Sequence, residues 1–293
     1  MEKDSPCKVN LLLNILGRRP DGFHELETVL HPVAFCDRLR FDRAAKGIEL
    51  TCNDPRLPTD GQNLVFRAAD AFLKSTRISS GVRIHLEKRI PMAAGLGGGS
   101  GNAATTLLGL NELFGQPLAP AQLQQLATGL GSDVPFFLQS RPALGTGRGE
   151  ILEPLDPFPC FCGAAFLLIH PGFGISTPWA YQQLRRFPWA LNGRPGRARE
   201  LVNALQAGPL KAAASGFYNS LEAPAFEKHP ILALYRDFLV EEGAAGALMS
   251  GSGSTVFGVC ASLADADRLA DKFRTRFGSA AWVRTVPAAP APA

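Results

Sequence analysis

The sequence predicts an α+β protein with two lobes, and three observations lead to this expectation. The first half of the chain is rich in loops and in short apolar runs that are typical of strands. Helical spacing of apolar residues becomes more common near residue 155 and beyond. The last residues form a stretch of Pro and Ala. We therefore expect an N-terminal lobe over residues 1–155, a C-terminal lobe over residues 156–286 and a disordered tail over residues 287–293.

Individual elements follow from hydrophobic periodicity and turn residues. Strands are expected over residues 6–17, 27–44, 47–53, 81–91 and 160–169, of which the first three form a meander. Helices are expected over residues 63–76, 100–115 and 119–130. Asn63 is a suitable N-cap for the first helix, and Gly115 ends the second. Residues 243–260 predict a strand, a glycine turn and a second strand.

Composition and charge limit the class of protein. Hydrophobic residues make up 46% of the 293 residues and charged residues 19%, which is typical of globular proteins. The net charge of +4 suits an anionic substrate, but no Lys/Arg cluster with interleaved aromatic residues predicts a nucleic-acid partner. Six scattered cysteines without a C-x-x-C pair indicate buried thiols in a reducing compartment. No secretory signal and no apolar run of about 18 residues is present, so we expect a cytoplasmic monomer or weak homodimer without a membrane partner.

A glycine-rich loop carries the first functional signal. Residues 91–105, PMAAGLGGGSGNAAT, contain five glycines within seven positions directly before a predicted helix. The P-loop pattern fails because no lysine follows the glycines, and the dinucleotide pattern fails because Ser100 replaces its third glycine. Backbone N–H groups at the positive end of a helix nevertheless form an anion site, to which Ser100 adds a hydroxyl donor. The loop therefore predicts phosphate binding.

This loop resembles the P-x-x-x-G-L-G-[GS]-[GS]-S signature of the galactokinase, homoserine kinase, mevalonate kinase and phosphomevalonate kinase superfamily. The blocks PCKVNLLLNILGRRPDGFHELET and MSGSGSTVFG resemble its terminal motifs. The D-G-F-H element and the blocks GSDVPFFL, HPGFGISTP and FYNSLE are similar to the branch that phosphorylates the 2-hydroxyl of 4-diphosphocytidyl-2-C-methyl-D-erythritol in the non-mevalonate isoprenoid pathway. The resemblance covers most of residues 5–285. It implies a ribosomal-protein-S5-like N-terminal lobe and a ferredoxin-like C-terminal lobe.

Lys8 and Asp133 are the expected catalytic residues. Lys8 lies on the first predicted strand between Cys7 and Val9, where an ammonium group is costly without a partner. The resemblance implies that Asp133 is this partner and that it acts on the substrate hydroxyl as a base or an orienting acceptor. Lys8 could hold Asp133 ionised, attract the hydroxyl proton or neutralise the moving phosphoryl group. Without the resemblance, a surface lysine and an aspartate that caps a turn before Pro135 would be the simpler interpretation.

The resemblance also implies a substrate site for the cytidyl-linked molecule. His24 would bond to the edge of the cytosine, while the aromatic rings of Phe23 and Tyr181 would stack on its two faces. Phe23 stands where Tyr is common in this branch, and Tyr181 where Phe is common, and both exchanges preserve stacking. A packed or exposed histidine and a plain hairpin turn are the simpler alternatives for His24 and for the glycines of the MSGSGS block. The implied substrate-binding residues are Asn10, Phe23, His24, Thr177, Tyr181, Gly251 and Gly253.

ATP and Mg²⁺ are the cofactors that the resemblance implies. The glycine loop would surround the triphosphate, and Asn63 and Leu64 would contact the adenine, although a helix cap and a core leucine explain these two residues equally well. No acidic cluster identifies the ligands of Mg²⁺. The expected ATP-binding residues are Asn63, Leu64, Pro91, Met92, Ala93, Ala94, Gly95, Leu96, Gly97, Gly98, Gly99, Ser100 and Gly101.

Three alternatives remain at the level of sequence. Another kinase of the superfamily, acting on homoserine or a mevalonate derivative, would have no use for a cytosine clamp. A nucleotide-binding regulator without catalysis would need neither Lys8 nor Asp133. An NAD-dependent oxidoreductase would need the missing third glycine and an acidic residue for the ribose.

Overall fold

The computed structural model describes residues 1–139 and 141–288, and the chain forms two compact units. Unit 1 contains Met1–Cys7, Phe35–Pro91 and residues 97–139. Unit 2 contains Lys8–Ala34, Met92–Leu96 and residues 141–288. The two long N-terminal strands, β1 (Glu2–Arg18) and β2 (His24–Ala44), each run from one unit into the other. The predicted boundary near residue 155 stays a prediction.

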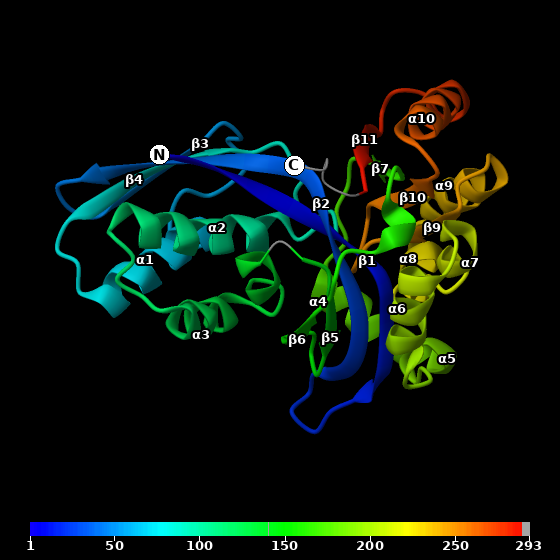
Figure 1. Ribbon diagram of the computed structural model, residues 1–293, viewed down its shortest axis with the longest axis horizontal. Coiled ribbons are helices and arrows are strands. Elements are labelled where there is room, and N and C mark those ends of the chain that lie inside the picture. Colours follow the sequence, from blue (N-terminus) through cyan, green and yellow to red (C-terminus); the bar gives the residue numbers. More distant parts are fainter. Residues whose placement is uncertain (140, 289–293) are drawn as a thin grey trace. The chain divides into compact units, whose positions relative to one another are not determined.

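In unit 1, helices cover one face of a small sheet (Figure 1). Strand β4 (Gly81–Glu87) is central, because it pairs in parallel with β3 (Ile48–Cys52) and antiparallel with the second half of β2. The inward residues of β4 are buried and alternate with exposed ones, as the sequence predicts. The helical elements of this unit are α1 (Leu64–Thr76), α2 (Gly98–Leu113), α3 (Pro120–Leu130) and the 3₁₀ helix η1 (Pro135–Leu138).

Helices α1 and α2 differ in how they are buried. Helix α1 is amphipathic, since its buried residues Val65, Ala68, Ala69 and Phe72 recur at helical spacing. Helix α2 is buried on most of its surface, and its small residues allow neighbours to approach closely. It begins two residues before the expected start, at Gly98, because Gly97 adopts the left-handed conformation with φ of 68° and serves as the N-cap.

In unit 2, the parts of β1 and β2 that belong to this unit pair with short strands of the same sheet. There β1 pairs in parallel with β8 (Tyr218–Asn219). The first half of β2 pairs with β5 (Ala143–Thr146), which pairs with β6 (Ile151–Pro154).

The remainder of unit 2 is a ferredoxin-like layer. Its strands lie in the order β11-β7-β10-β9, and each neighbouring pair is antiparallel. Numbered along the chain, this order is fourth, first, third and second, which is the order of the predicted ferredoxin-like lobe. All six residues of β7 are buried, as expected for a central strand. These strands are β7 (Ala165–His170), β9 (Gly246–Met249), β10 (Val256–Cys260) and β11 (Trp282–Pro287).

Helices of unit 2 connect and cover this layer. Helices α9 and α10 contact its strands, and Leu239 and Phe273 are fully buried from these two helices. The crossover between β7 and β9 contains several shorter helices in place of a single one. The helical elements are η2 (Pro159–Phe161), α4 (Thr177–Gln183), η3 (Leu184–Arg186), α5 (Pro188–Leu191), α6 (Arg197–Ala207), α7 (Leu210–Ala214), α8 (Glu222–Lys228), α9 (Pro230–Glu241) and α10 (Leu263–Phe277).

Several sequence predictions need correction. The predicted meander is wrong at its third strand, because β3 pairs with β4 and α1 connects the two. The strand expected from residue 160 begins only at Ala165, because Pro159 opens a 3₁₀ turn. The predicted tail over residues 287–293 starts too early, since β11 includes Pro287 and the N–H of the buried Ala288 donates to the carbonyl of Ala164. Residues 289–293 of that prediction lie outside the described residues.

The six cysteines are free thiols. Cys7 and Cys260 are buried, as predicted, and burial raises the pKa of Cys260 to about 11. Cys162 is exposed, so the prediction of buried thiols is wrong there. Across residues 1–139 and 141–288, no helix has the length and apolar character needed to span a membrane.

Two glycine-to-alanine substitutions test the packing of unit 1. A Cβ at Gly109 of α2 would lie 2.7 Å from Cε2 of the fully buried Phe41. Gly109→Ala should therefore lower the free energy of unfolding by about 1–2 kcal/mol, because overpacking exceeds the gain in helix propensity. Gly129→Ala in α3 is the matched control, since its Cβ meets no atom within 4 Å and the change should be neutral or stabilising. Urea denaturation measures both, and equal effects would contradict the packing of α2 on β2.

Candidate active site

The lysine of the first strand lies inside unit 2. Lys8 is 3% exposed, and its Nζ donates to Oδ1 of Asn10 at 2.5 Å and to the carbonyl of Gly95 at 3.1 Å. Lys8 and Asn10 are two residues apart on β1, so their side chains project from the same face. The amide of Asn10 donates to the hydroxyl of Thr28 at 2.9 Å. The buried ammonium group therefore has polar partners within its own unit.

The glycine loop passes close to the turn between β9 and β10. A Cβ on Gly95, which has φ of 75°, would lie 2.0 Å from the carbonyl oxygen of Ser250. The hydroxyl of Ser250 donates to the carbonyl of Gly95 at 2.9 Å, and the N–H of Thr255 donates to the carbonyl of Ala94 at 3.1 Å. On the other side, the N–H of Lys8 donates to the carbonyl of Leu96 at 2.9 Å. Only glycine fits at position 95.

Gly251 and Gly253 lie in the turn between β9 and β10, where the sequence predicts a glycine turn. A Cβ on Gly251 would lie 3.3 Å from Nζ of Lys8 and 3.3 Å from Oδ1 of Asn10. A Cβ on Gly253 would lie 2.6 Å from Sδ of Met249. The structure therefore brings Lys8, Asn10 and this turn together within unit 2.

Two side chains that the sequence analysis missed hold this turn. The amide of Asn219, at the end of β8, donates to the carbonyls of Met249 and Gly251 at 2.7 and 2.8 Å. Glu222, at the start of α8, accepts the N–H of Met249 at 2.8 Å. Burial raises the pKa of Glu222 to about 7, although the N–H of Met249 and the guanidinium of Arg236 oppose this shift. The FYNSLE block contains both residues, so the sequence marked their position without indicating their roles.

Of the three rings predicted to bind cytosine, those of His24 and Tyr181 lie side by side, whereas Phe23 packs against Arg148. The rings of His24 and Tyr181 are in contact, with centroids 5.1 Å apart and planes inclined by 41°. The hydroxyl of Thr177 lies 2.8 Å from the hydroxyl of Ser252. Burial and the nearby charge of Arg18 lower the pKa of His24, so the imidazole is neutral at pH 7. A neutral imidazole offers one donor and one acceptor.

Phe23 has a different environment from the other two rings. Its side chain is 53% exposed, and the guanidinium carbon of Arg148 lies 4.6 Å from its ring centroid. One face of this ring is thus covered by a cation, and only its other face could stack on a base. The opposed stacking of Phe23 and Tyr181 stays a prediction.

In unit 1, the N-terminus of α2 has the properties of an anion site. Gly97 is the N-cap and provides no side chain, Gly99 is exposed, and Ser100 contributes a hydroxyl in the first turn. Free N–H groups and the helix dipole make such an end positive. The N–H of Gly101 already donates to the carbonyl of Gly97 at 2.8 Å, so the N–H groups before Gly101 are the ones that a helix leaves without a carbonyl partner of its own.

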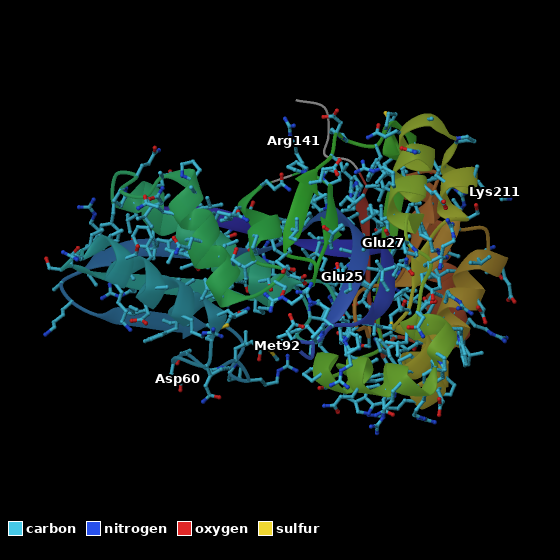
Figure 2. The ribbon with its side chains drawn as sticks, turned by 90° about the horizontal axis from the view of Figure 1, so that it is seen from below. Glu25, Glu27, Asp60, Met92, Arg141 and Lys211 are labelled. Atoms are coloured by element: carbon cyan, nitrogen blue, oxygen red, sulfur yellow. The ribbon has the colours of Figure 1, made fainter. Side chains whose placement is uncertain are left out.

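The other predicted ATP-binding residues divide into two groups. Asn63 caps α1, because its Oδ1 accepts the N–H of Val65 and its Nδ2 donates to the carbonyl of Pro58. Leu64 lies close to the loop, since a Cβ on Gly99 would lie 3.6 Å from its Cδ1. Pro91 and Met92 are half-buried, and Figure 2 labels Met92. Ala93 is exposed, with φ of 50°. A role for each of these residues in ATP binding stays a prediction.

A buried ion pair supports α2 and was missed by the sequence analysis. Oδ2 of Asp37 lies 2.5 Å from Nζ of Lys88, and both side chains are almost completely buried. Asp37 also accepts the N–H groups of Arg89 and Ile90 and the side-chain amide of Asn102 in α2. This carboxylate therefore joins the end of β4 to the first turns of α2. The alternation of buried and exposed residues along β2 could have identified Asp37, because it lies on the same face of the strand as the buried Leu39 and Phe41.

Asp133 lies half-buried in a turn of unit 1, directly before η1. It does not cap η1, whose N-cap is Val134 without a side-chain hydrogen bond. Lys8 belongs to unit 2, so the pairing of Lys8 with Asp133 stays a prediction. Among residues 1–139 and 141–288, no group of three or more His, Cys, Asp and Glu side chains is arranged to hold a metal ion.

Comparisons with known proteins bear on the function. Residues 63–141 match the family described as GHMP kinases N terminal domain, and residues 190–279 match GHMP kinases C terminal. The chain is 44% identical over 276 residues to the 4-diphosphocytidyl-2-C-methyl-D-erythritol kinase of Synechococcus sp. (strain JA-3-3Ab), covering 92% of this chain and 88% of that one. A crystal structure of 4-(cytidine 5'-diphospho)-2C-methyl-D-erythritol kinase superposes with a TM-score of 0.80 at 37% identity, covering 98% and 99% of the two chains.

A more distant structure supports the fold alone. Homoserine kinase from Cytophaga hutchinsonii superposes with a TM-score of 0.76 at 19% identity, covering 98% of this chain and 94% of that chain. These matches confirm the predicted two-lobed small-molecule kinase fold.

Replacing Glu222 with Gln should remove a pH-dependent loss of stability. The pKa of Glu222 is about 7 in the folded protein against an ordinary 4.5, so between these values the folded state holds a proton that the unfolded state has lost. The free energy of unfolding therefore falls as pH rises through this window, by up to about 3 kcal/mol. Glu222→Gln keeps the acceptor for the N–H of Met249 and cannot ionise. Urea denaturation at about pH 5 and about pH 8 measures the difference.

The control for this change is Glu227→Gln on the same helix, whose carboxylate is exposed and paired with Arg186. It should leave the pH dependence unchanged. A Glu222→Gln protein with the full pH dependence of the unmodified chain would contradict the assignment.

Proposed function

Since the chain belongs to the 4-diphosphocytidyl-2-C-methyl-D-erythritol kinase family of the GHMP kinases, we propose that it transfers the γ-phosphate of ATP to the 2-hydroxyl of 4-diphosphocytidyl-2-C-methyl-D-erythritol. One observation carries this proposal. The similarity to relatives that bear this name extends over about nine-tenths of the chain. The product is an intermediate of isoprenoid biosynthesis.

The triphosphate of ATP binds at the N-terminus of α2. Backbone N–H groups of residues 97–100 and the hydroxyl of Ser100 donate to the phosphate oxygens, and Leu64 contacts the adenine. Exposed Gly99 supports this assignment, because it lets the backbone approach the phosphates without a side chain. Asn63 contributes through its backbone and the cap that orients α1.

Mg²⁺ fits the oxygen donors of this region. Magnesium binds through one or two protein oxygens, phosphate oxygens and waters, and the Ser100 hydroxyl in the first turn of α2 is a hard oxygen donor. When bound, the ion neutralises charge on the phosphates. We assign no other ligand to it.

Lys8 and Asp133 have different roles in the proposed transfer. Asp133 accepts or orients the proton of the hydroxyl, and Lys8 supplies positive charge for the transferred phosphoryl group. The hydrogen bonds of Lys8 to Asn10 and Gly95 support this role, because they hold its ammonium group without neutralising its charge. Asn10 and the turn at Gly251 lie beside Lys8 and bind the methylerythritol end.

The cytidine end binds at His24 and Tyr181. A neutral His24 offers a donor and an acceptor to the edge of the base, and Tyr181 offers a stacking face. Phe23 provides a second apolar surface, and Thr177 bonds to the substrate from the start of α4. The free thiols support a cytoplasmic enzyme, which acts as a monomer or weak homodimer without a nucleic-acid or membrane partner.

A substrate panel tests the proposed function. The purified chain is incubated with ATP and Mg²⁺ and with the cytidyl-linked methylerythritol, homoserine or mevalonate, and ADP release is followed. We expect turnover with the first substrate alone. Turnover with homoserine or mevalonate would identify another kinase of the superfamily, and no turnover with any of them would favour a nucleotide-binding regulator.

Asp133→Asn should reduce kcat by about 10²–10⁴-fold, because the amide cannot accept the hydroxyl proton as a base. ATP affinity, measured by calorimetry, should stay within a few-fold, since the change removes no phosphate donor. Asp156→Asn is the control, because Asp156 is a highly exposed carboxylate. An unchanged kcat in Asp133→Asn would remove this residue from the mechanism.

His24→Ala should raise KM for the cytidyl-linked substrate about tenfold and leave KM for ATP unchanged, because the base loses a hydrogen-bonding and packing partner. His85→Ala is the matched control, since His85 lies exposed on β4 of unit 1. Steady-state kinetics with each substrate varied separately measures the effect. If the two variants had the same KM for the cytidyl-linked substrate, His24 would not belong to its site.

A further inference from the structure

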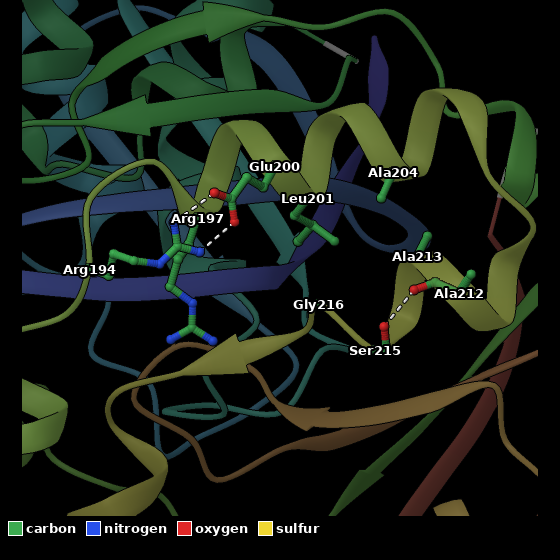
Figure 3. Close-up of a pocket in the computed structure, with 9 residues that line it drawn as sticks. All are labelled: Arg194, Arg197, Glu200, Leu201, Ala204, Ala212, Ala213, Ser215 and Gly216. Carbon is green, nitrogen blue, oxygen red and sulfur yellow. Dashed lines mark hydrogen bonds and ion pairs between the residues drawn. The ribbon is translucent and has the colours of Figure 1, made fainter.

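A pocket of about 270 Å³ lies in unit 2 between α6 and α7, next to β8 (Figure 3). Leu201 and Ala204 of α6 and Ala212 and Ala213 of α7 give it an apolar wall. None of its lining residues belongs to the proposed kinase site. The pocket therefore needs an explanation of its own.

Arg197 is the charged group of this pocket without an ionic partner. Its guanidinium carbon lies 3.6 Å from the ring centroid of Tyr218, and the side chain is half-buried. Among residues 1–139 and 141–288, no carboxylate or carbonyl accepts a hydrogen bond from it. A guanidinium that stacks through its face keeps the N–H donors in its plane available. These donors can bind a carboxylate or a phosphate in a bidentate manner.

The second arginine of the pocket is already neutralised. Arg194 binds both carboxylate oxygens of Glu200, at 2.6 and 2.5 Å. Glu200 also lies close enough to feel the charge of Arg197, but its two oxygens are occupied by Arg194. Two arginines against one glutamate leave the pocket with one net positive charge.

Buried polar side chains of β1 and β2 fix the start of α6, which carries Arg197. Glu27 of β2 (labelled in Figure 2) accepts the N–H groups of Gly196 and Ala198 at the start of α6, at 3.1 and 3.2 Å. Asn14 of β1 donates to Glu27 and to the carbonyl of Arg194, both at 2.8 Å. Because Glu27 is buried, this end of α6 is fixed to the strands beneath it. Arg197 is therefore preorganised for a ligand.

We infer that this pocket binds a small organic anion, in which a carboxylate or a phosphate monoester meets Arg197 and a short apolar body lies against Leu201, Ala204 and Ala213. A cavity of about 150 Å³ holds benzene, so this volume suits a ligand of roughly ten non-hydrogen atoms. Ser215 offers a further hydroxyl at the rim, although it already donates to the carbonyl of Ala212 at 2.7 Å. The inference stands whether or not the kinase proposal holds.

Methyl NMR of the full-length chain tests the inference. Alanine methyl groups are labelled, saturating ADP occupies any nucleotide site, and the methyl signals of Ala204, Ala212 and Ala213 are followed. Phenyl phosphate and benzoate are the amphipathic probes, and they distinguish a phosphate ligand from a carboxylate. Inorganic phosphate and benzyl alcohol are the control ligands, since the first carries only the anionic group of such a probe and the second only its aromatic body. We expect saturable shifts of these signals with at least one amphipathic probe and about tenfold weaker binding of both control ligands.

Variants identify the charge and the cavity separately. Arg197→Gln should weaken binding of the amphipathic probe about tenfold, whereas Arg199→Gln on the same helix, where Arg199 pairs with Glu153 outside the pocket, should leave it within twofold. Ala204→Leu fills the pocket and should abolish the shifts even if Arg197→Gln folds poorly. Equal weakening by Arg197→Gln and Arg199→Gln, full binding in Ala204→Leu, or no shift of the three methyl signals would overturn the inference.

Discussion

The close approach of Ala94 and Gly95 to the turn between β9 and β10 is the constraint on which the site in unit 2 depends. The carbonyl of Gly95 receives both the ammonium of Lys8 and the hydroxyl of Ser250, so one peptide group fixes the position of the buried charge. No side chain can stand at position 95, because the carbonyl of Ser250 occupies that space. The glycine at position 95 therefore allows two backbone segments to come into contact. The phosphate contacts proposed for this loop are a different requirement, and they involve other residues, 97–100.

Polar side chains in the interior of unit 2 support this contact. The amide of Asn219 binds two carbonyls of the turn, Glu222 binds an N–H, and Asn10 links Lys8 to Thr28. Buried polar groups are costly unless their hydrogen bonds are made, so these bonds specify one arrangement of the turn. Glu222 is the group whose bonds do not fully offset burial, which is why its pKa rises.

The sequence predicted the residues that local patterns can reveal. Lys8 and Asn10 stood out as polar residues two apart in an apolar strand, and the glycines of the loop stood out by number. Glu27 and Asn219 were missed because their partners lie far along the chain, at residues 196–198 and 249–251. A periodic pattern of residues in the sequence does not reveal such distant pairs. Asp37 could have been found, since it stands in phase with buried apolar residues of β2 and must have a buried partner. That its partner is Lys88 follows only from the fold.

The error at β3 explains how the glycine loop reaches its place in unit 1. A meander would make β3 antiparallel to its neighbour, but the helix α1 crosses over between β3 and β4, and such a crossover makes the two strands parallel. After β4, the chain is held by Asp37, which pairs with Lys88 and accepts the N–H of Ile90. The chain then enters α2 at Gly98, and Asn102 of this helix donates to the same carboxylate. A helix that follows a strand through a glycine loop presents its positive end at that edge of the sheet. The crossover through α1 sets the direction of β4, and with it the edge of the sheet at which the N-terminus of α2 follows.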